Sequence, residues 1–400
     1  MKKLALSLLI IGGVVTSCSN DDDGDTSNLI VAPATYNFTR SGNSTVNFGG
    51  QTTRIQMAEE FISALKDNNS TKTQLNAMFA HVEGENDFSD ANLNASNKSV
   101  RSKVAASTDY FSANTTASNA IKADFDGFIG AQVDEVFLNW STNASAGNAG
   151  QLQQAGGGTI RYINEKGLEY NQAFAKGLIG ALMMDQILNN YLSPAVLDAG
   201  TNVADNDAGT IASGKDYTTM EHKWDEAYGY LYGNEANPAV PVLEADQFLS
   251  EYLDRVEGDT DFSGIAANVY DAFKLGRAAI VAKNYTVRNQ QAEIIRENIS
   301  KIPAVRAVFY LQAGKASLDT DKAKAFHALS EAYGFIYSLQ FTRQPNATVP
   351  YFTKAEVDAY LAQLMEGNGF WDVTAQTLDT ISDGISAKFG FTTAQAAPAN

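Results

Sequence analysis

The chain contains the stretch His222-Lys-Trp-Asp-Glu-Ala-Tyr-Gly-Tyr-Leu-Tyr232 and repeats it, with changes, as His327-Ala-Leu-Ser-Glu-Ala-Tyr-Gly-Phe-Ile-Tyr337. Both copies read H-x-x-x-E-A-Y-G, and together they hold two of the three histidines in the protein. A repeat that carries so rare a residue in both copies indicates an internal duplication. It also indicates a paired site, although the pattern alone names neither a ligand nor a reaction.

A second, weaker repeat occurs in the same order. Segment 82–89 (V-E-G-E-N-D-F-S) resembles segment 256–263 (V-E-G-D-T-D-F-S), and each precedes one copy of the first element. Chance similarity is the alternative explanation for this weaker pair. We predict two related halves, 54–240 and 241–345, within one duplicated helical domain, 35–345. Segment 92–160, rich in Asn, Ser, Ala and Gly, is the natural insertion in the first half.

Apolar residues follow a helical period over most of the chain, so the predicted fold is mostly α, a duplicated helical bundle. Long helices are expected over 170–192 and 288–314, the second with a break or kink at Pro303. Thr353 and Glu356 form a capping box that begins a helical pair within 346–400. Alternating residues between 31 and 50 predict one short N-terminal hairpin or extended segment.

The N-terminus has the features of a lipoprotein export signal. Two lysines precede an apolar run that is too short to cross a membrane, and Cys18, the one cysteine in the protein, follows in a lipobox. We therefore predict a signal peptide over 1–17 and a lipid anchor on Cys18, with an acidic, flexible tether over 18–34. A soluble exported protein with a chance cysteine is the alternative.

The net charge of the protein limits the classes of partner that it is expected to bind. The formal net charge of the chain is −17, and without residues 1–17 it is −19. Such an acidic protein does not suit nucleic acid or direct adhesion to anionic lipid. It suits cations, basic partner surfaces or simple solubility.

The repeated element places a histidine and a glutamate on one face of each predicted helix, four residues apart. The candidate ligands for iron, zinc or manganese are therefore His222, Glu226, His327 and Glu331, with Asp225 as an additional carboxylate. If the two helices meet, these side chains should converge near Gly229 and Gly334, two helix-interior glycines that indicate a close approach. The competing interpretation is a buried His–Glu hydrogen bond in each copy that fixes helix register.

Three blocks resemble a known family: 36–38 (Y-N-F), 46–54 (V-N-F-G-G-Q-T-T-R) and 221–233 (E-H-K-W-D-E-A-Y-G-Y-L-Y-G). They are similar to lipoproteins of Bacteroidota-type bacteria grouped as domain of unknown function 4856, from about Thr35 to the C-terminus. These proteins look like relatives of imelysins, helical envelope proteins with two bundle halves that are linked to iron uptake. The imelysin motif G-x-H-x-x-E corresponds to 220–225 here, with Met for Gly and Asp for Glu.

The resemblance implies an outer-membrane lipoprotein, more often at the cell surface than on the periplasmic face. It implies binding of iron, haem or another metal during uptake, and carries metal binding over to His222 and, with less weight, to Asp225 or Glu226. The alternative is a non-catalytic interaction or scaffold subunit of an outer-membrane receptor system. We predict no enzymatic activity, because the imelysin motif is not intact and no hydrolase motif is present.

Overall fold

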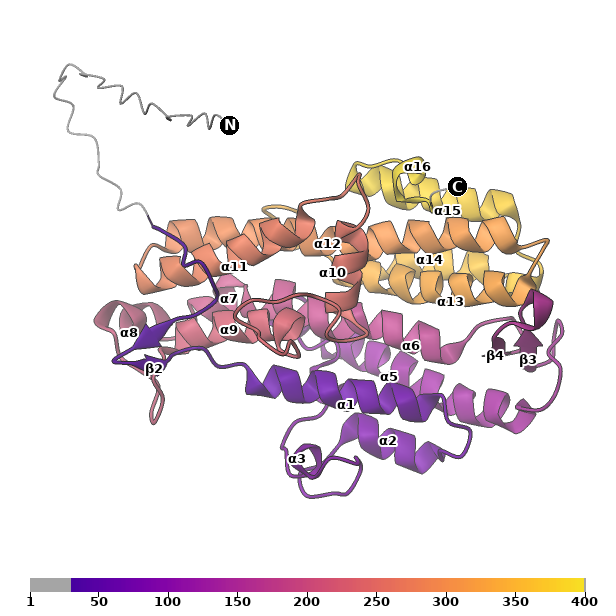
Figure 1. The fold of residues 1–400 in the computed structure, drawn as a ribbon, viewed down its shortest axis with the longest axis horizontal. Helices are drawn as coiled ribbons and strands as arrows, with labels where there is room; N and C mark the ends of the chain where they lie inside the picture. Colours follow the sequence, from indigo (N-terminus) through magenta and orange to yellow (C-terminus); the bar gives the residue numbers. More distant parts are fainter. Residues whose placement is uncertain (1–29, 399–400) are drawn as a thin grey trace, which may run out of the picture.

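The computed structural model describes residues 30–398 and confirms the mostly α fold. Helices make up most of the described chain, and the only sheets in it are two small two-stranded hairpins (Figure 1). Cys18 and the predicted signal peptide lie outside the described residues. No helix among residues 30–398 combines the length and the apolar composition that crossing a bilayer requires.

The part of the chain up to residue 240 contains the predicted hairpin, the predicted first half (54–240) and, near its end, the first copy of the repeated element. Its strands are β1 (Thr39–Arg40), β2 (Asn43–Ser44), β3 (Gly150–Gln153) and β4 (Ile160–Ile163). Its α-helices are α1 (Gly49–Leu65), α2 (Lys72–Ala80), α3 (Ala91–Asn94), α4 (Thr108–Phe111), α5 (Thr115–Ala131), α6 (Tyr170–Leu178), α7 (Pro194–Leu197), α8 (Asn202–Ala208) and α9 (Thr219–Tyr232). Helix α6 continues without interruption through two π-helical stretches, η5 (Ile179–Met184) and η6 (Ile187–Tyr191).

The predicted second half, 241–345, contains α10 (Leu249–Glu257), α11 (Ile265–Val281), α12 (Tyr285–Ser317) and α13 (Lys322–Ser338). The C-terminal helices α14 (Lys354–Leu364), α15 (Ala375–Phe389) and α16 (Thr393–Ala396) follow. The predicted capping box is present at the start of α14, where Thr353 and Glu356 cap each other.

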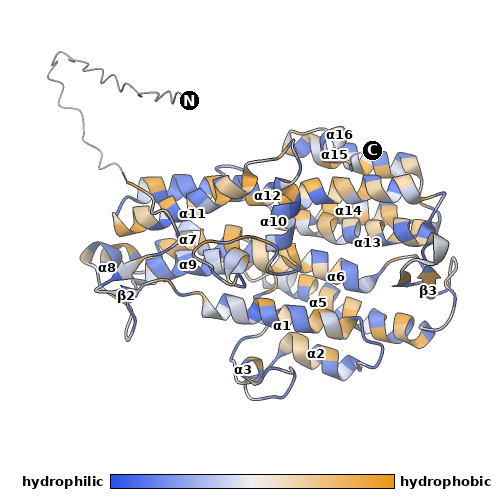
Figure 2. Ribbon diagram, viewed as in Figure 1, coloured by the Kyte–Doolittle hydropathy of each residue, from blue (hydrophilic) through white to orange (hydrophobic). Residues whose placement is uncertain are grey.

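Helix α12 is the longest element of the described chain, and several other helices pack against it. Helices α11, α13 and α15 pack on it, α13 also packs on α6, and α9 packs on η6 and α1. Figure 1 shows the resulting stack, with α11 and α12 above, α9 and α6 in the middle, and α1 and α2 below. Most helices carry both apolar and polar residues (Figure 2), and their buried faces form one continuous hydrophobic core.

Four helices occur in the same order in each predicted half, although α1, α3, α4, α7 and α8 have no counterpart in the second. A nine-residue helix (α2, α10) is followed by a 17-residue helix (α5, α11), a long helix (α6–η5–η6, α12) and the helix with the repeated element (α9, α13). This order is what a duplication predicts, and the duplication itself stays a prediction. If α5 corresponds to α11 and α9 to α13, the additional residues of the first half lie on both sides of α5 and also between η6 and α9, rather than in one insertion.

Two details differ from the sequence-based expectation. Helix α12 is not broken at Pro303, because Pro303 lies on the buried face of the helix, where packing against neighbouring helices offsets the missing hydrogen bond. The hairpin of β3 and β4 was not predicted, since its strands are only four residues long and lie in an Asn/Gly-rich segment.

The repeated glycines mark close helix contacts, as expected. A Cβ atom on Gly334 would lie 2.6 Å from the Lys176 Cβ and 3.0 Å from the Ala173 carbonyl oxygen, both on α6. A Cβ atom on Gly229 would lie 2.3 Å from the Phe48 Cβ. What approaches each glycine is therefore a different part of the bundle, and neither the other copy nor a ligand-sized space.

Replacing Gly334 by Ala is expected to lower the free energy of unfolding by about 1–3 kcal/mol, because the new methyl group meets backbone atoms of α6 that cannot move aside. Gly127 on α5 is the matched control, since nothing lies within 4 Å of a Cβ added there. Gly127→Ala is expected to raise stability by about 0.4–1 kcal/mol. Urea unfolding measures both, and equal effects would refute this account of the packing.

Candidate functional site

Helix α9 has one face that is buried and a neighbouring face that borders a cavity. The capping box at its start fixes where the helix begins, and so which residues lie on each face. Thr218 and Glu221 form a capping box, in which the Glu221 amide donates to Thr218 Oγ1 at 3.3 Å and the Thr218 amide donates to Glu221 Oε2 at 2.7 Å. Glu221 and Asp225, four residues apart, are fully buried on one face. His222 and Glu226 lie on the next face, which borders a cavity.

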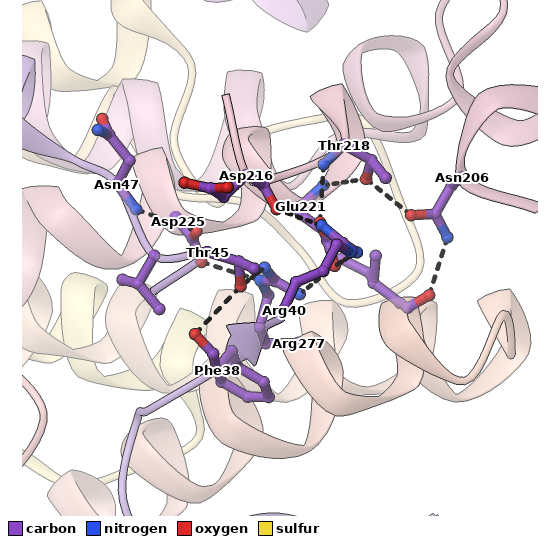
Figure 3. A network of polar contacts seen from close by, with 12 residues as sticks. Phe38, Arg40, Thr45, Asn47, Asn206, Asp216, Thr218, Glu221, Asp225 and Arg277 are labelled. Carbon is purple, nitrogen blue, oxygen red and sulfur yellow. Dashed lines mark hydrogen bonds and ion pairs between the residues drawn. The ribbon is translucent and has the colours of Figure 1, made fainter. Parts of the chain in front are cut away.

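The buried face of α9 is held by an arginine of α11. The Arg277 guanidinium, with no exposed surface, donates to Asp225 Oδ1, Glu221 Oε1 and Thr45 Oγ1, each at 3.0 Å (Figure 3). Arg40 of β1 donates to both oxygens of Glu221 at 3.0 Å. This network therefore ties the N-terminal hairpin, α9 and α11 together.

Asp225 is committed to this network and does not border the cavity. Its carboxylate also accepts a hydrogen bond from the Tyr36 hydroxyl at 2.7 Å and from the Asn47 amide at 3.3 Å. Burial raises the pKa of Asp225 to about 6, although Arg277 opposes the shift. Burial would also raise the pKa of Glu221, but Arg277 and Arg40 lower it overall. Asp225 therefore lies apart from the cavity that His222 borders, and its predicted part in a metal site finds no support in this geometry.

The cavity beside His222 has a volume of about 620 Å³ and is strongly basic. We call it the cationic cavity. Five cationic side chains and a single carboxylate, Glu226, line it, so its formal net charge is +4 in a chain whose net charge is −17. The five are Arg54, Lys98, Lys103, Lys215 and Lys223.

His222 is held in one orientation at the wall of this cavity. Its Nδ1 lies 2.9 Å from the Asn47 carbonyl oxygen, so Nδ1 carries the proton and Nε2 of the neutral ring is free to accept. The ring stacks on Tyr217 with centroids 4.6 Å apart, and Nε2 lies 3.9 Å from Glu226. Glu226 in turn pairs with Lys223 at 2.7 Å and accepts from Gln51 at 3.1 Å.

The second copy borders a different cavity, with a volume of about 690 Å³, which we call the aromatic cavity after Tyr252, Phe309 and Tyr310 in its wall. His327 Nδ1 lies 2.9 Å from Glu169, and Nε2 lies 3.9 Å from Glu331. Because the two nitrogens point in opposite directions, these two carboxylates cannot share one ion with the ring.

The two cavities have related walls. In each, the glutamate of the repeated element faces a lysine, Lys223 at 2.7 Å or Lys176 at 3.6 Å. Each lysine lies over a tyrosine ring, Tyr191 at 5.5 Å or Tyr252 at 4.7 Å. The same four residue types, His, Glu, Lys and Tyr, therefore meet at the edge of each cavity, with the His and Glu supplied by the repeat in both.

The expected convergence of His222, Glu226, His327 and Glu331 is wrong. The two pairs border separate cavities that have no lining residue in common. No group of three or more His, Cys, Asp or Glu side chains within residues 30–398 is arranged to hold a metal ion. The i, i+4 spacing correctly predicted each His–Glu pair, because spacing fixes neighbours on one helix. It carries no information about which helices meet, since α9 and α13 pack on different parts of the bundle.

Sequence reasoning missed the residues that give each site its charge. Arg277 follows Phe273 and precedes Ile280 on the apolar face of α11, so a charge among apolar positions was a readable signal of a buried ion pair. Lys98 and Lys103 come from a segment without regular periodicity, and no local pattern places them opposite His222.

A comparison with protein families agrees with the blocks described above. The family model of the domain of unknown function DUF4856 matches residues 33–392, so the chain belongs to this family. Neither the curated proteins nor the solved structures include a match to the chain.

Replacing Arg277 by Met is expected to lower the free energy of unfolding by about 3–5 kcal/mol, because it leaves Glu221 and Asp225 buried without their counter-ion. Arg255 is the control, since it also bonds two carboxylates but is about half exposed. Arg255→Met is expected to cost less than about 1 kcal/mol. Chemical denaturation compares the two, and similar losses would mean that the buried network does not organise the fold.

Proposed function

We propose that this member of the DUF4856 family is a non-catalytic binding protein whose main ligand is a small anion with more than one negative charge. The cationic cavity is the proposed site. The observation that carries the proposal is the gathering of five cationic side chains around one carboxylate in an otherwise acidic protein.

The cations of this cavity lack the partners that the rest of the protein provides. Of the five cationic side chains of this cavity, only Lys223 forms an ion pair with a carboxylate within the described residues. Arg54 donates instead to the carbonyl oxygens of Ser99 and Gly50. Burial lowers the pKa of Lys103, and the charges of Arg54 and Lys223 lower it further. Such crowding costs stability in the empty protein, and a bound polyanion offsets that cost.

A bare metal ion fits this cavity poorly. His222 Nε2 and Glu226 supply only two donors, whereas protein sites for zinc and iron use three or four, and the net charge of +4 repels a cation. Haem needs an apolar slot, and the walls here are mainly polar. An iron chelate with outward carboxylates carries the charge that the cavity favours. We therefore propose that, if the protein acts in iron uptake, it binds iron as such an anionic chelate and not as a bare ion.

The envelope location continues as a proposal and rests on the N-terminal sequence. A lipid on Cys18 would hold the protein at the outer membrane, with the folded part beyond the acidic tether. Replacing Cys18 by Ala is expected to move the protein from the membrane to the soluble fraction of lysed cells, as immunoblotting of fractions measures. Membrane retention of this variant would remove the basis for the anchor.

One observation supports the alternative role as an interaction subunit of a receptor. The loop between α9 and α10 exposes Val242, with 80 % of its surface accessible, next to Leu243 and Glu244, whose φ angles are +67° and +60°. Backbone held in this conformation without glycine is strained, and such strain clusters at functional sites such as ligand clamps and switch regions. Co-purification of an outer-membrane protein with wild type but not with Val242→Asp would favour this role over ligand binding.

Calorimetric titration with citrate and with sulfate tests the proposed function. The double variant Lys98→Gln/Lys103→Gln is expected to bind citrate at least about tenfold more weakly, a loss of about 1.4 kcal/mol or more. The control is Lys322→Gln/Lys324→Gln, which removes the same charge from exposed positions on α13 and should bind as wild type does. Equal weakening in both would show an effect of net charge alone.

The same preparations, titrated with zinc and iron salts, test the metal hypothesis. Binding by wild type that a His222→Ala/His327→Ala variant lacks would restore a metal site. Absence of that difference would leave both histidines as structural or anion-binding residues.

Sulfate binding is expected to strengthen as the pH falls from about 7.5 to about 5.5, by roughly 3–10-fold. Burial lowers the pKa of His222 below its usual value, although Glu226 opposes the shift, so the ring is neutral at the higher pH. A bound anion favours the imidazolium form, and binding therefore takes up a proton. Sulfate keeps its own charge over this range. His222→Gln should remove the dependence, and an unchanged pH profile would exclude His222 from the site.

A further inference from the structure

Six arginines of the described chain are buried, and two of them lack a carboxylate partner. The two are Arg54, in the wall of the cationic cavity, and Arg306, in the wall of the aromatic cavity. The other four each form an ion pair with Asp or Glu: Arg277, Arg288, Arg296 and Arg343. Unpaired buried arginines thus coincide with the two cavities that the repeated element borders.

Arg306 is the more isolated of the two. Only 6 % of its surface is exposed, and its buried Nε has no hydrogen-bond partner in the described part of the chain. Its guanidinium carbon lies 4.0 Å from the ring centroid of Phe309 and 4.7 Å from that of Tyr310. Ring faces attract the guanidinium but accept few of its five N–H groups. Since arginine keeps its charge when buried, its in-plane donors remain available for an oxyanion.

We propose that the aromatic cavity is a second ligand site, which binds a carboxylate attached to a ring. Arg306 pairs with the carboxylate through its planar fork, and Phe309 and Tyr310 pack against the ring of the ligand. Lys66, which also has no carboxylate partner among the described residues, borders the same cavity. This inference does not depend on the proposed function of the cationic cavity.

The charge of this cavity selects a monoanion. Four cationic side chains line it together with the carboxylates of Glu251, Asp254 and Glu331, so its formal net charge is +1. A ligand with several negative charges would meet these carboxylates, whereas a single carboxylate on an apolar or sugar ring would not. Aromatic acids and uronic acids share this chemistry, and the choice of probe separates them.

The test is titration of wild type with 4-hydroxybenzoate and with glucuronate, followed by calorimetry and by thermal unfolding. One of the two is expected to bind and to raise the melting temperature, and the one that binds identifies the ring. Arg306→Met is expected to weaken this binding at least about tenfold. Without ligand, it should unfold at the same temperature as wild type or higher, since it removes an unpaired buried charge.

Two controls make the outcome decisive. Arg101→Met, at a half-exposed ion pair with Asp126, should leave carboxylate binding unchanged. Sulfate binding at the cationic cavity should be the same in Arg306→Met as in wild type. The two titrations therefore test the two proposed sites independently. If Arg306→Met does not fold, Arg306→Lys replaces it and should also lose at least most of the binding, because lysine lacks the planar fork. Undiminished binding by the folded variant, or binding of neither probe by wild type, would overturn the proposal.

Discussion

The ion network around Arg277 is the interaction on which the arrangement of the first site depends. A fully buried guanidinium needs full compensation, and here Glu221, Asp225 and Thr45 provide it from two other parts of the chain. The geometry that satisfies Arg277 also positions Asn47, whose carbonyl oxygen orients His222. One face of α9 thus anchors the N-terminal segment, and the adjacent face uses that segment as the wall of a cavity.

The two cavities show how one repeated element serves two chemical environments. The element itself supplies His, Glu and a close-packing glycine, and it does so equally in both copies. The surrounding segments determine the other lining residues of each cavity. They supply several lysines and an arginine to one cavity, and aromatic rings with nearly balanced charges to the other. Similar sequences at the cavity edge are therefore compatible with different ligands, because most of the charged residues of each cavity come from segments outside the repeat.

Local patterns predicted what local physics controls. Helical periodicity gave the mostly α fold, the capping box marked the start of α14, and the spacing of His222 and Glu226 made them neighbours. The joining of α9 to α11 through Arg277, and the separation of His222 from His327, depend on contacts between segments far apart in the sequence. Metal binding at these pairs stays a prediction, because the sequence did not show which charges would surround them.

The continuous helix α6–η5–η6 carries part of both cavities, with Lys176 near its beginning and Tyr191 at its end. Fifteen residues separate these two positions, a span of about 20 Å. Two π-helical stretches lie between them, and such turns are rare within α-helices and frequent at functional sites. If ligands at the two cavities were coupled through this helix, the coupling free energy would be the same in both directions, so each ligand would change the affinity for the other by the same factor.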